Sequence, residues 1–183
     1  PSNPFSGPAG AKATSSFLVI NHGVVGNPNK LRATLAHELF HAFENAYNHT
    51  GFFSATGAKW IMEASATWAE WKFANAVPTS RAGPVFRQFQ GAKISLQDDA
   101  YANGYVSFGW PLFLDQEHPG SVRVLWEQIE GASGNRIMDA IDSVLPFEEN
   151  FRVFAMRAWN KDLGIGAPVT PLLDAPPVSA GGG

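Results

Sequence analysis

Residues 34–43 read TLAHELFHAF, and their two histidines, His37 and His41, lie four positions apart. Apolar residues recur at helical spacing around them, so we expect one helix over about residues 30–47, with Asn29 as its N-cap. Side chains four positions apart lie one turn apart on the same face of a helix. Both imidazoles can therefore reach a single metal ion.

Glu38 directly follows His37 and is rotated off the line of the two imidazoles. A carboxylate in that place can accept a proton from a metal-bound water, and neutral imidazole nitrogens are typical zinc ligands. The H-E-x-x-H pattern in a helix therefore predicts a zinc hydrolase with His37 and His41 as ligands and Glu38 as the general base. Each histidine taken alone could instead be a hydrogen-bonded core residue.

A catalytic zinc site needs a third protein ligand. The metzincin extension of the pattern is absent, since Glu44 replaces its glycine and Tyr47 replaces its last histidine. Residues 60–70 read WIMEASATWAE and predict a second helix over about residues 58–75, on which Glu63 is a carboxylate among apolar residues. We expect Glu63 to be the third ligand, because a buried carboxylate needs a partner.

Alternatives to this third ligand exist. Glu63 could be a first-turn carboxylate favoured by the dipole of the helix. Asp98 or Asp99 could supply an aspartate ligand, as in the aspzincin group, although the surrounding pattern matches poorly. Glu44 lies one turn beyond His41, where a solvated or capping carboxylate is the ordinary expectation.

Residues 34–43 and 60–70 together resemble the gluzincin metallopeptidases, the thermolysin-like branch of the zincins, and the second helix resembles that of secreted bacterial members. The resemblance implies a mainly helical α+β zincin-like domain with one Zn²⁺, held by His37, His41 and Glu63, and Glu38 as general base. It also implies a peptide or protein substrate, lying along a short N-terminal β element. Residues 17–21, an apolar and partly β-branched run, predict that strand.

Two further roles follow from the resemblance. Gluzincins often have a tyrosine that donates a hydrogen bond to the oxyanion, and Tyr105 is the first choice for it, Tyr101 the second. A core or rim tyrosine is the alternative. Thermolysin-like enzymes have an aspartate four residues after the ligand glutamate, where this chain has Thr67. We therefore expect support for a ligand from Glu70, with Thr67 able at most to donate a hydrogen bond.

The remaining elements are less informative. His22 follows the predicted strand, where it could face the substrate cleft of the enzyme. We expect His49 and His118 to lie in surface loops. Residues 79–100 are expected to be rich in loops. Further helices are predicted after Gly104, with Pro111 interrupting or starting the first, and then over residues 119–130, 135–144 and 149–160. The tryptophans of the second helix are expected to belong to the core.

Composition limits what the 183-residue chain can be. Hydrophobic residues make up 45% of it, which suffices for one buried core, and the net charge of -3 without a basic tract argues against nucleic acid as a partner. Cysteine is absent, so a transition metal must be held by histidines and carboxylates. No apolar run is long enough to span a bilayer.

Over half of the 13 prolines lie in residues 1–10 and 167–183. We interpret residues 1–14 and 167–183 as linker-like segments and residues 15–166 as the metallopeptidase domain, a monomeric part of a larger protein that is secreted or extracellular and bacterial in type. The sequence leaves two other functions open. One is a non-catalytic peptide- or glycan-binding module on a zincin scaffold, and the other is a zinc hydrolase of a non-peptide amide.

Overall fold

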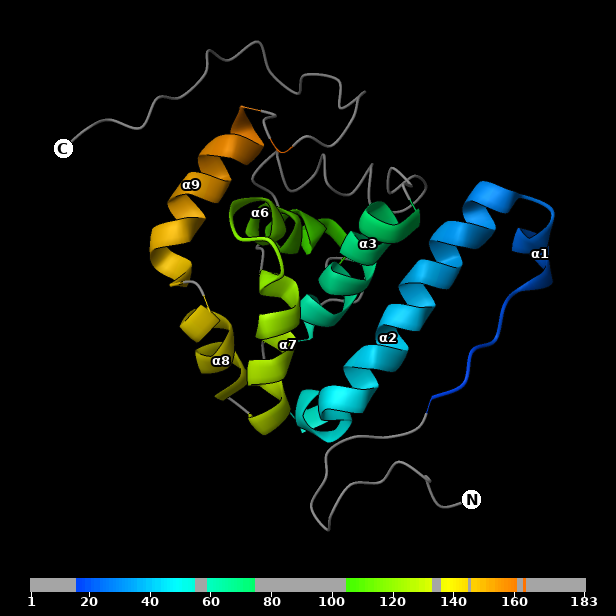
Figure 1. Cartoon of the computed structure of the whole chain (residues 1–183), viewed down its shortest axis with the longest axis horizontal. Coiled ribbons are helices and arrows are strands. Elements are labelled where there is room, and N and C mark those ends of the chain that lie inside the picture. Colours follow the sequence, from blue (N-terminus) through cyan, green and yellow to red (C-terminus); the bar gives the residue numbers. More distant parts are fainter. Residues whose placement is uncertain are drawn as a thin grey trace.

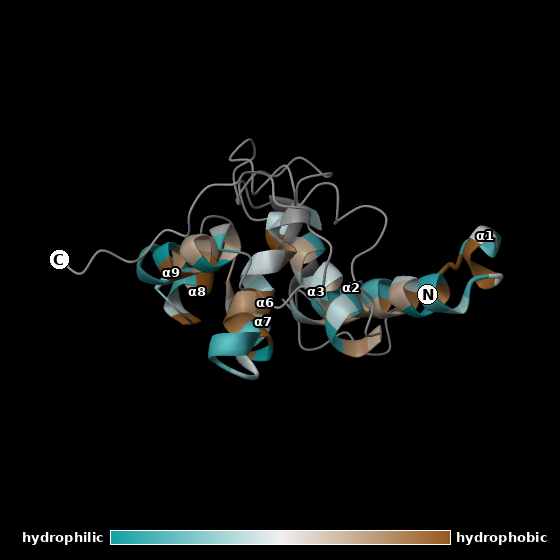
Figure 2. Cartoon of the chain, turned by 90° about the horizontal axis from the view of Figure 1, so that it is seen from above, coloured by the Kyte–Doolittle hydropathy of each residue, from teal (hydrophilic) through white to brown (hydrophobic). Residues whose placement is uncertain are grey.

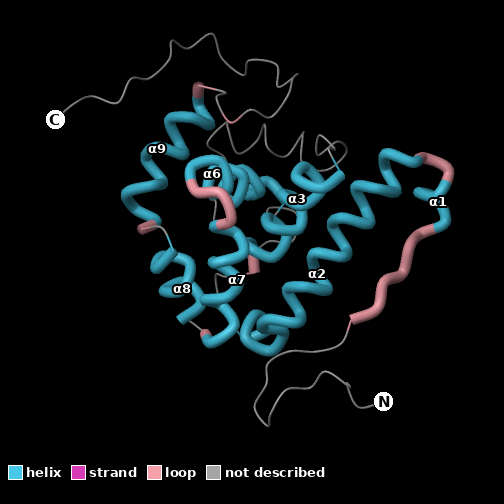
Figure 3. Tube along the Cα trace, viewed as in Figure 1, coloured by secondary structure: helices cyan, strands magenta, loops and turns pink. Residues whose placement is uncertain are grey.

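The computed structural model describes residues 16–54, 59–74, 105–132, 136–144, 146–160 and 163. Within these residues the chain is mainly helical and forms no strand (Figures 1 and 3). The helices are α1 (His22–Val25), α2 (Pro28–Ser54), α3 (Trp60–Ala74), the 3-10 helix η1 (Tyr105–Phe108), α6 (Gly109–Glu117), α7 (Ser121–Gly131), α8 (Arg136–Val144) and α9 (Phe147–Trp159). The expectation of a mainly helical domain is thus confirmed for the described part of the chain.

The long helix α2 begins earlier and ends later than the sequence indicates. Its N-cap is Asn27, whose Oδ1 accepts a hydrogen bond from the backbone N–H of Lys30 (3.1 Å), and Pro28 occupies the first helical position, where its missing N–H is not needed. Asn29 is therefore inside the helix. Gly51 also lies inside it, because one glycine costs a helix only about 1 kcal/mol.

The strand expected at residues 17–21 is not formed. This segment is irregular and connects to α1, whose N-cap Asn21 accepts a hydrogen bond from the Gly23 N–H (2.8 Å). Phe17 and Val19 are 90% and 76% exposed, and no described residue pairs with the segment as a second strand. A strand depends on such a partner, so apolar and β-branched composition alone does not produce one. The expectation that an extended peptide would lie along the edge of this strand is therefore wrong as well.

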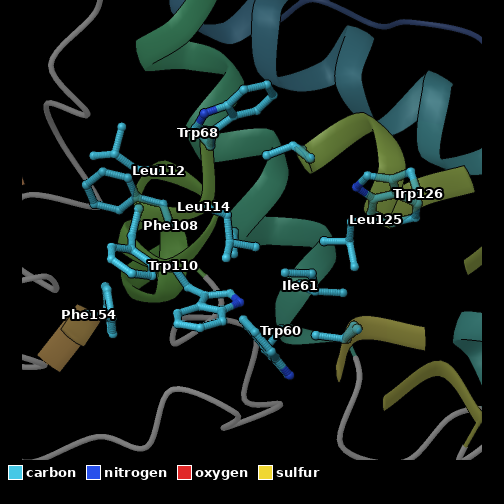
Figure 4. Close-up of a cluster of buried hydrophobic side chains, with 14 of the residues drawn as sticks. Trp60, Ile61, Trp68, Phe108, Trp110, Leu112, Leu114, Leu125, Trp126 and Phe154 are labelled. Atoms are coloured by element: carbon cyan, nitrogen blue, oxygen red, sulfur yellow. The ribbon is translucent and has the colours of Figure 1, made fainter. Parts of the chain in front are cut away.

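Helix α3 lies at the centre of the described core. Nine of its residues are buried, and it packs against α2, η1 and α6. The tryptophans Trp60, Trp68 and Trp126 belong to the buried apolar core (Figure 4). Trp126 of α7 donates its indole N–H to Ser65 Oγ at 3.2 Å. A helix that is apolar on most sides is held by its surroundings from several directions. This fixes the position of every side chain that α3 presents to α2.

Helices α2 and α3 lie side by side (Figure 1). Phe40 of α2 packs edge-on against Trp68 and Trp126, with ring centroids 5.7 and 6.4 Å apart. Seen from above, the helices follow one another from α8 and α9 at one end of the molecule, through α2, to α1 at the other end (Figure 2). None of the described helices combines the length and the apolar character needed to cross a bilayer.

The other predicted helices are present with small differences in their bounds. Pro111 lies in the first turn of α6, where proline is tolerated, so it helps to start this helix and does not interrupt it. Helix α7 begins at Ser121, because Gly120 before it adopts a left-handed turn conformation with φ 90°. Residues 1–14, 79–100 and 167–183, for which a linker or loop was expected, lie outside the described residues.

Candidate metal centre

His37, His41 and Glu63 converge where α2 faces α3. The Nε2 atoms of the two histidines are 3.1 Å apart, and Glu63 Oε2 lies 3.4 Å from Nε2 of His37 and 3.7 Å from Nε2 of His41. In the described part of the chain, this is a group of side chains that could hold a metal ion. The two helices thus bring together the three ligands expected from the sequence.

The spacing of these three atoms fits a zinc ion. Ligand atoms about 2.0–2.1 Å from a tetrahedral ion are separated from one another by roughly 3.4 Å. The observed separations of 3.1, 3.4 and 3.7 Å scatter around that value. In addition, Glu63 Oε2 is buried and has no hydrogen-bond partner among the described residues, so a cation would satisfy it.

Both imidazoles are also held from their other side by carboxylates. His37 Nδ1 donates to Glu70 Oε1 of α3 at 2.8 Å, and His41 Nδ1 donates to Glu44 Oε2 at 2.6 Å. A neutral imidazole that carries its proton on Nδ1 has a lone pair on Nε2. Two Nε2 lone pairs and a carboxylate oxygen then face one another and repel. A metal ion bound between them would remove this repulsion.

Helical periodicity explains this arrangement. On α2, His37, His41 and Glu44 follow one another at i, i+4 and i+7, and on α3 the residues Glu63 and Glu70 lie at i and i+7, so each set forms one stripe. Thr67 stands between the two glutamates and is fully buried, but its hydroxyl has no hydrogen-bond partner in the described residues. As the sequence suggested, support for His37 comes from Glu70.

The carboxylates make both imidazoles strong bases. Burial alone would lower the pKa of His37, but the carboxylates of Glu63 and Glu70 outweigh it and raise that pKa to about 9. Burial likewise opposes the charged form of His41, and Glu44 and Glu63 raise its pKa to about 10. Burial would raise the pKa of Glu63, but the two imidazoles lower it to about 2. Protons and a metal ion thus compete for the same nitrogens.

Zinc binding is therefore expected to release protons and to strengthen with rising pH. Below a pKa of about 9 for His37 and about 10 for His41, the metal-free imidazoles bind protons that a metal must displace. At pH 7 we expect one to two protons released per zinc ion, so that affinity rises roughly ten- to a hundredfold per pH unit between pH 6.5 and 8. Calorimetry in buffers with different heats of ionisation measures this release. An affinity that stays flat over that range would contradict it.

The remaining predicted residues lie in different surroundings. Glu38 is exposed on α2 beside His37. Tyr105 begins η1 and stacks on the His37 ring, with centroids 5.5 Å apart and planes 13° from parallel. Tyr101, Asp98 and Asp99 lie outside the described residues.

Neither His22 nor His118 is among the described residues that could hold the metal. His22 is the exposed first residue of α1, and His49 lies within α2 and not in a surface loop. His118, which follows α6, is exposed as expected.

Sequence reasoning missed Glu44. Its side chain is only 1% exposed, whereas a solvated or capping carboxylate was expected. The available signal was the continuation of the histidine stripe to i+7, which places Glu44 on the face that α3 covers.

Comparisons with known proteins add no assignment, because no family model, curated protein or solved structure matches this chain.

Proposed function

We propose that this chain is a zinc-dependent hydrolase of peptide bonds, arranged as in the gluzincin branch of the zincins. The observation that carries the proposal is the convergence of His37, His41 and Glu63 at distances that fit a zinc ion. Two further features support it. The first two ligands have carboxylate partners on Nδ1, and the third has a buried oxygen without a hydrogen-bond partner in the described residues.

The roles of the side chains follow from their positions. Nε2 of each histidine and Oε2 of Glu63 hold the metal. The chemistry that a bound zinc ion supplies is Lewis acidity towards a carbonyl oxygen and a water molecule. The carboxylate of Glu38, which is exposed on α2, would accept the proton of the attacking water and then give it to the leaving amine.

Tyr105 completes the proposed machinery. Its ring lies against His37 and the residue is 8% exposed, so it borders the centre. We assign its hydroxyl to hydrogen bonding of the oxyanion that forms at the attacked carbonyl. Tyr101 remains the second candidate from the sequence, and a secreted, monomeric protein remains an expectation.

A peptide-library digest tests the function. Zinc-loaded wild-type protein is expected to cleave peptides of the library, detected by mass spectrometry, to lose this cleavage with a chelator, and to regain it when zinc is added back. His41→Ala prepared in the same way is the control for a contaminating protease, and it should be inactive. Stoichiometric zinc without any cleavage would favour the binding module or a non-peptide amide, and cleavage that survives the chelator would overturn the zinc mechanism.

A further inference from the structure

Glu44 is a buried carboxylate whose hydrogen-bond partner, His41, is a candidate metal ligand. Its residue is 2% exposed, and its Oε2 accepts the 2.6 Å hydrogen bond from His41 Nδ1. Its other oxygen, Oε1, is buried and has no hydrogen-bond partner in the described part of the chain. Burying a carboxylate with one unsatisfied oxygen costs free energy, so its presence in this place needs a reason other than packing.

Asp115 shows what a structural buried carboxylate looks like in the same molecule. It is 8% exposed, its Oδ2 accepts from Lys72 Nζ at 2.7 Å, and its Oδ1 accepts from the Gly120 N–H at 3.4 Å. These contacts tie α3 to α6 and to the turn before α7, and both oxygens have partners. Among the described acidic residues, Asp115 and Glu44 are the two that are buried, and Glu44 lacks a lysine or arginine partner.

We propose that Glu44 is a positioning residue of the metal centre, an inference that rests on the zinc site proposed above. By accepting the Nδ1 proton of His41, it holds the imidazole in the tautomer that presents a lone pair on Nε2, and it fixes the rotation of the ring towards Glu63. Its negative charge stabilises the divalent cation that the centre binds. In the metal-free protein the protonated imidazole of His41 carries the charge opposite to this carboxylate, and a bound cation takes over that role.

The placement of Glu44 makes this support different from that of Glu70. Glu70 reaches His37 from the neighbouring helix, 33 residues away, so that hydrogen bond depends on the docking of α3. Glu44 is three residues from His41 on α2 itself, so its hydrogen bond is set by the geometry of one helix. The two carboxylates therefore hold the two imidazoles independently, one within a helix and one between helices.

Zinc affinity of Glu44→Gln tests the proposal, because glutamine keeps the shape of the side chain and removes its charge. We expect zinc to bind about 10- to 100-fold more weakly than in wild type, measured by competition with a chromophoric chelator. The absorption spectrum of the Co²⁺-loaded variant should change as well. Asp115→Asn is the matched control, and it should lower the melting temperature while leaving zinc affinity unchanged.

The outcomes separate this proposal from the proposed function. If wild type binds no zinc, or if His41→Ala binds it as well as wild type does, the metal site itself is wrong. If wild type binds zinc and His41→Ala does not, but Glu44→Gln binds it as tightly as wild type, the positioning role is wrong and the site stands. Unchanged circular dichroism shows that each variant is folded.

Discussion

Glu63→Ala is expected to lose stoichiometric zinc. Glu63 supplies the only carboxylate of the three converging donors, and its Oε2 lies within 3.4 and 3.7 Å of the two Nε2 atoms. Two imidazoles alone leave the ion with an incomplete set of protein ligands. Because each ligand contributes a few kcal/mol to the binding free energy of a zinc site, affinity should fall by roughly 10³-fold or more.

Metal analysis after dialysis measures this loss directly, with a chelator competition for the residual affinity. Glu130→Ala, at an exposed position of α7, is the control for the removal of one negative charge, and it should retain about one zinc ion per chain. Zinc bound to Glu63→Ala as tightly as to wild type would show that the third ligand comes from elsewhere, with Asp98 and Asp99 as the next residues to replace.

Glu38→Gln is expected to separate metal binding from chemistry. Glu38 is exposed and is not among the converging donors, so zinc content should remain at the wild-type level. Glutamine cannot accept the proton of the attacking water, and loss of a general base lowers kcat by about 10²- to 10⁴-fold. Hydrolysis of a peptide identified in the library digest measures kcat and zinc content on the same sample.

Glu38→Asp provides the graded comparison, because it keeps the carboxylate but shortens its reach. It should lie between wild type and Glu38→Gln in kcat, with zinc content again unchanged. Full activity in Glu38→Gln would assign the proton transfer to another group, and a simultaneous loss of zinc would mean that Glu38 acts on the metal site itself.

The features of the centre that could be predicted from the sequence are those set by helical geometry. The i, i+4 spacing of His37 and His41 places both on one face of α2 whatever the rest of the chain does, and the same periodicity links Glu63 to Glu70 on α3. The two stripes face each other only because α3 packs against α2. The apolar residues around each stripe already indicated that these helix faces would be buried. The local sequence pattern was therefore sufficient to predict which side chains come together as candidate metal ligands.

Two expectations failed because they depended on distant parts of the chain. Residues 17–21 have the composition of a strand, yet a strand requires a partner that no described residue supplies. Glu44 looks like a surface residue in isolation, and it becomes buried because α3 covers that part of α2. In both cases the outcome depends on a part of the chain that is remote in sequence, and for Glu44 the i+7 spacing from His37 was the signal that sequence reasoning did not use.

The order of α2 and α3 in the chain has a consequence for how the protein folds. All three donors come from two consecutive helices, with α2 ending at Ser54 and α3 beginning at Trp60. Closing this short connection costs less entropy than forming later contacts such as that between Ser65 and Trp126, 61 residues apart. The proposed metal site therefore draws no donor from beyond α3, whereas the apolar sides of α3 are covered by η1 and α6, which come later in the chain.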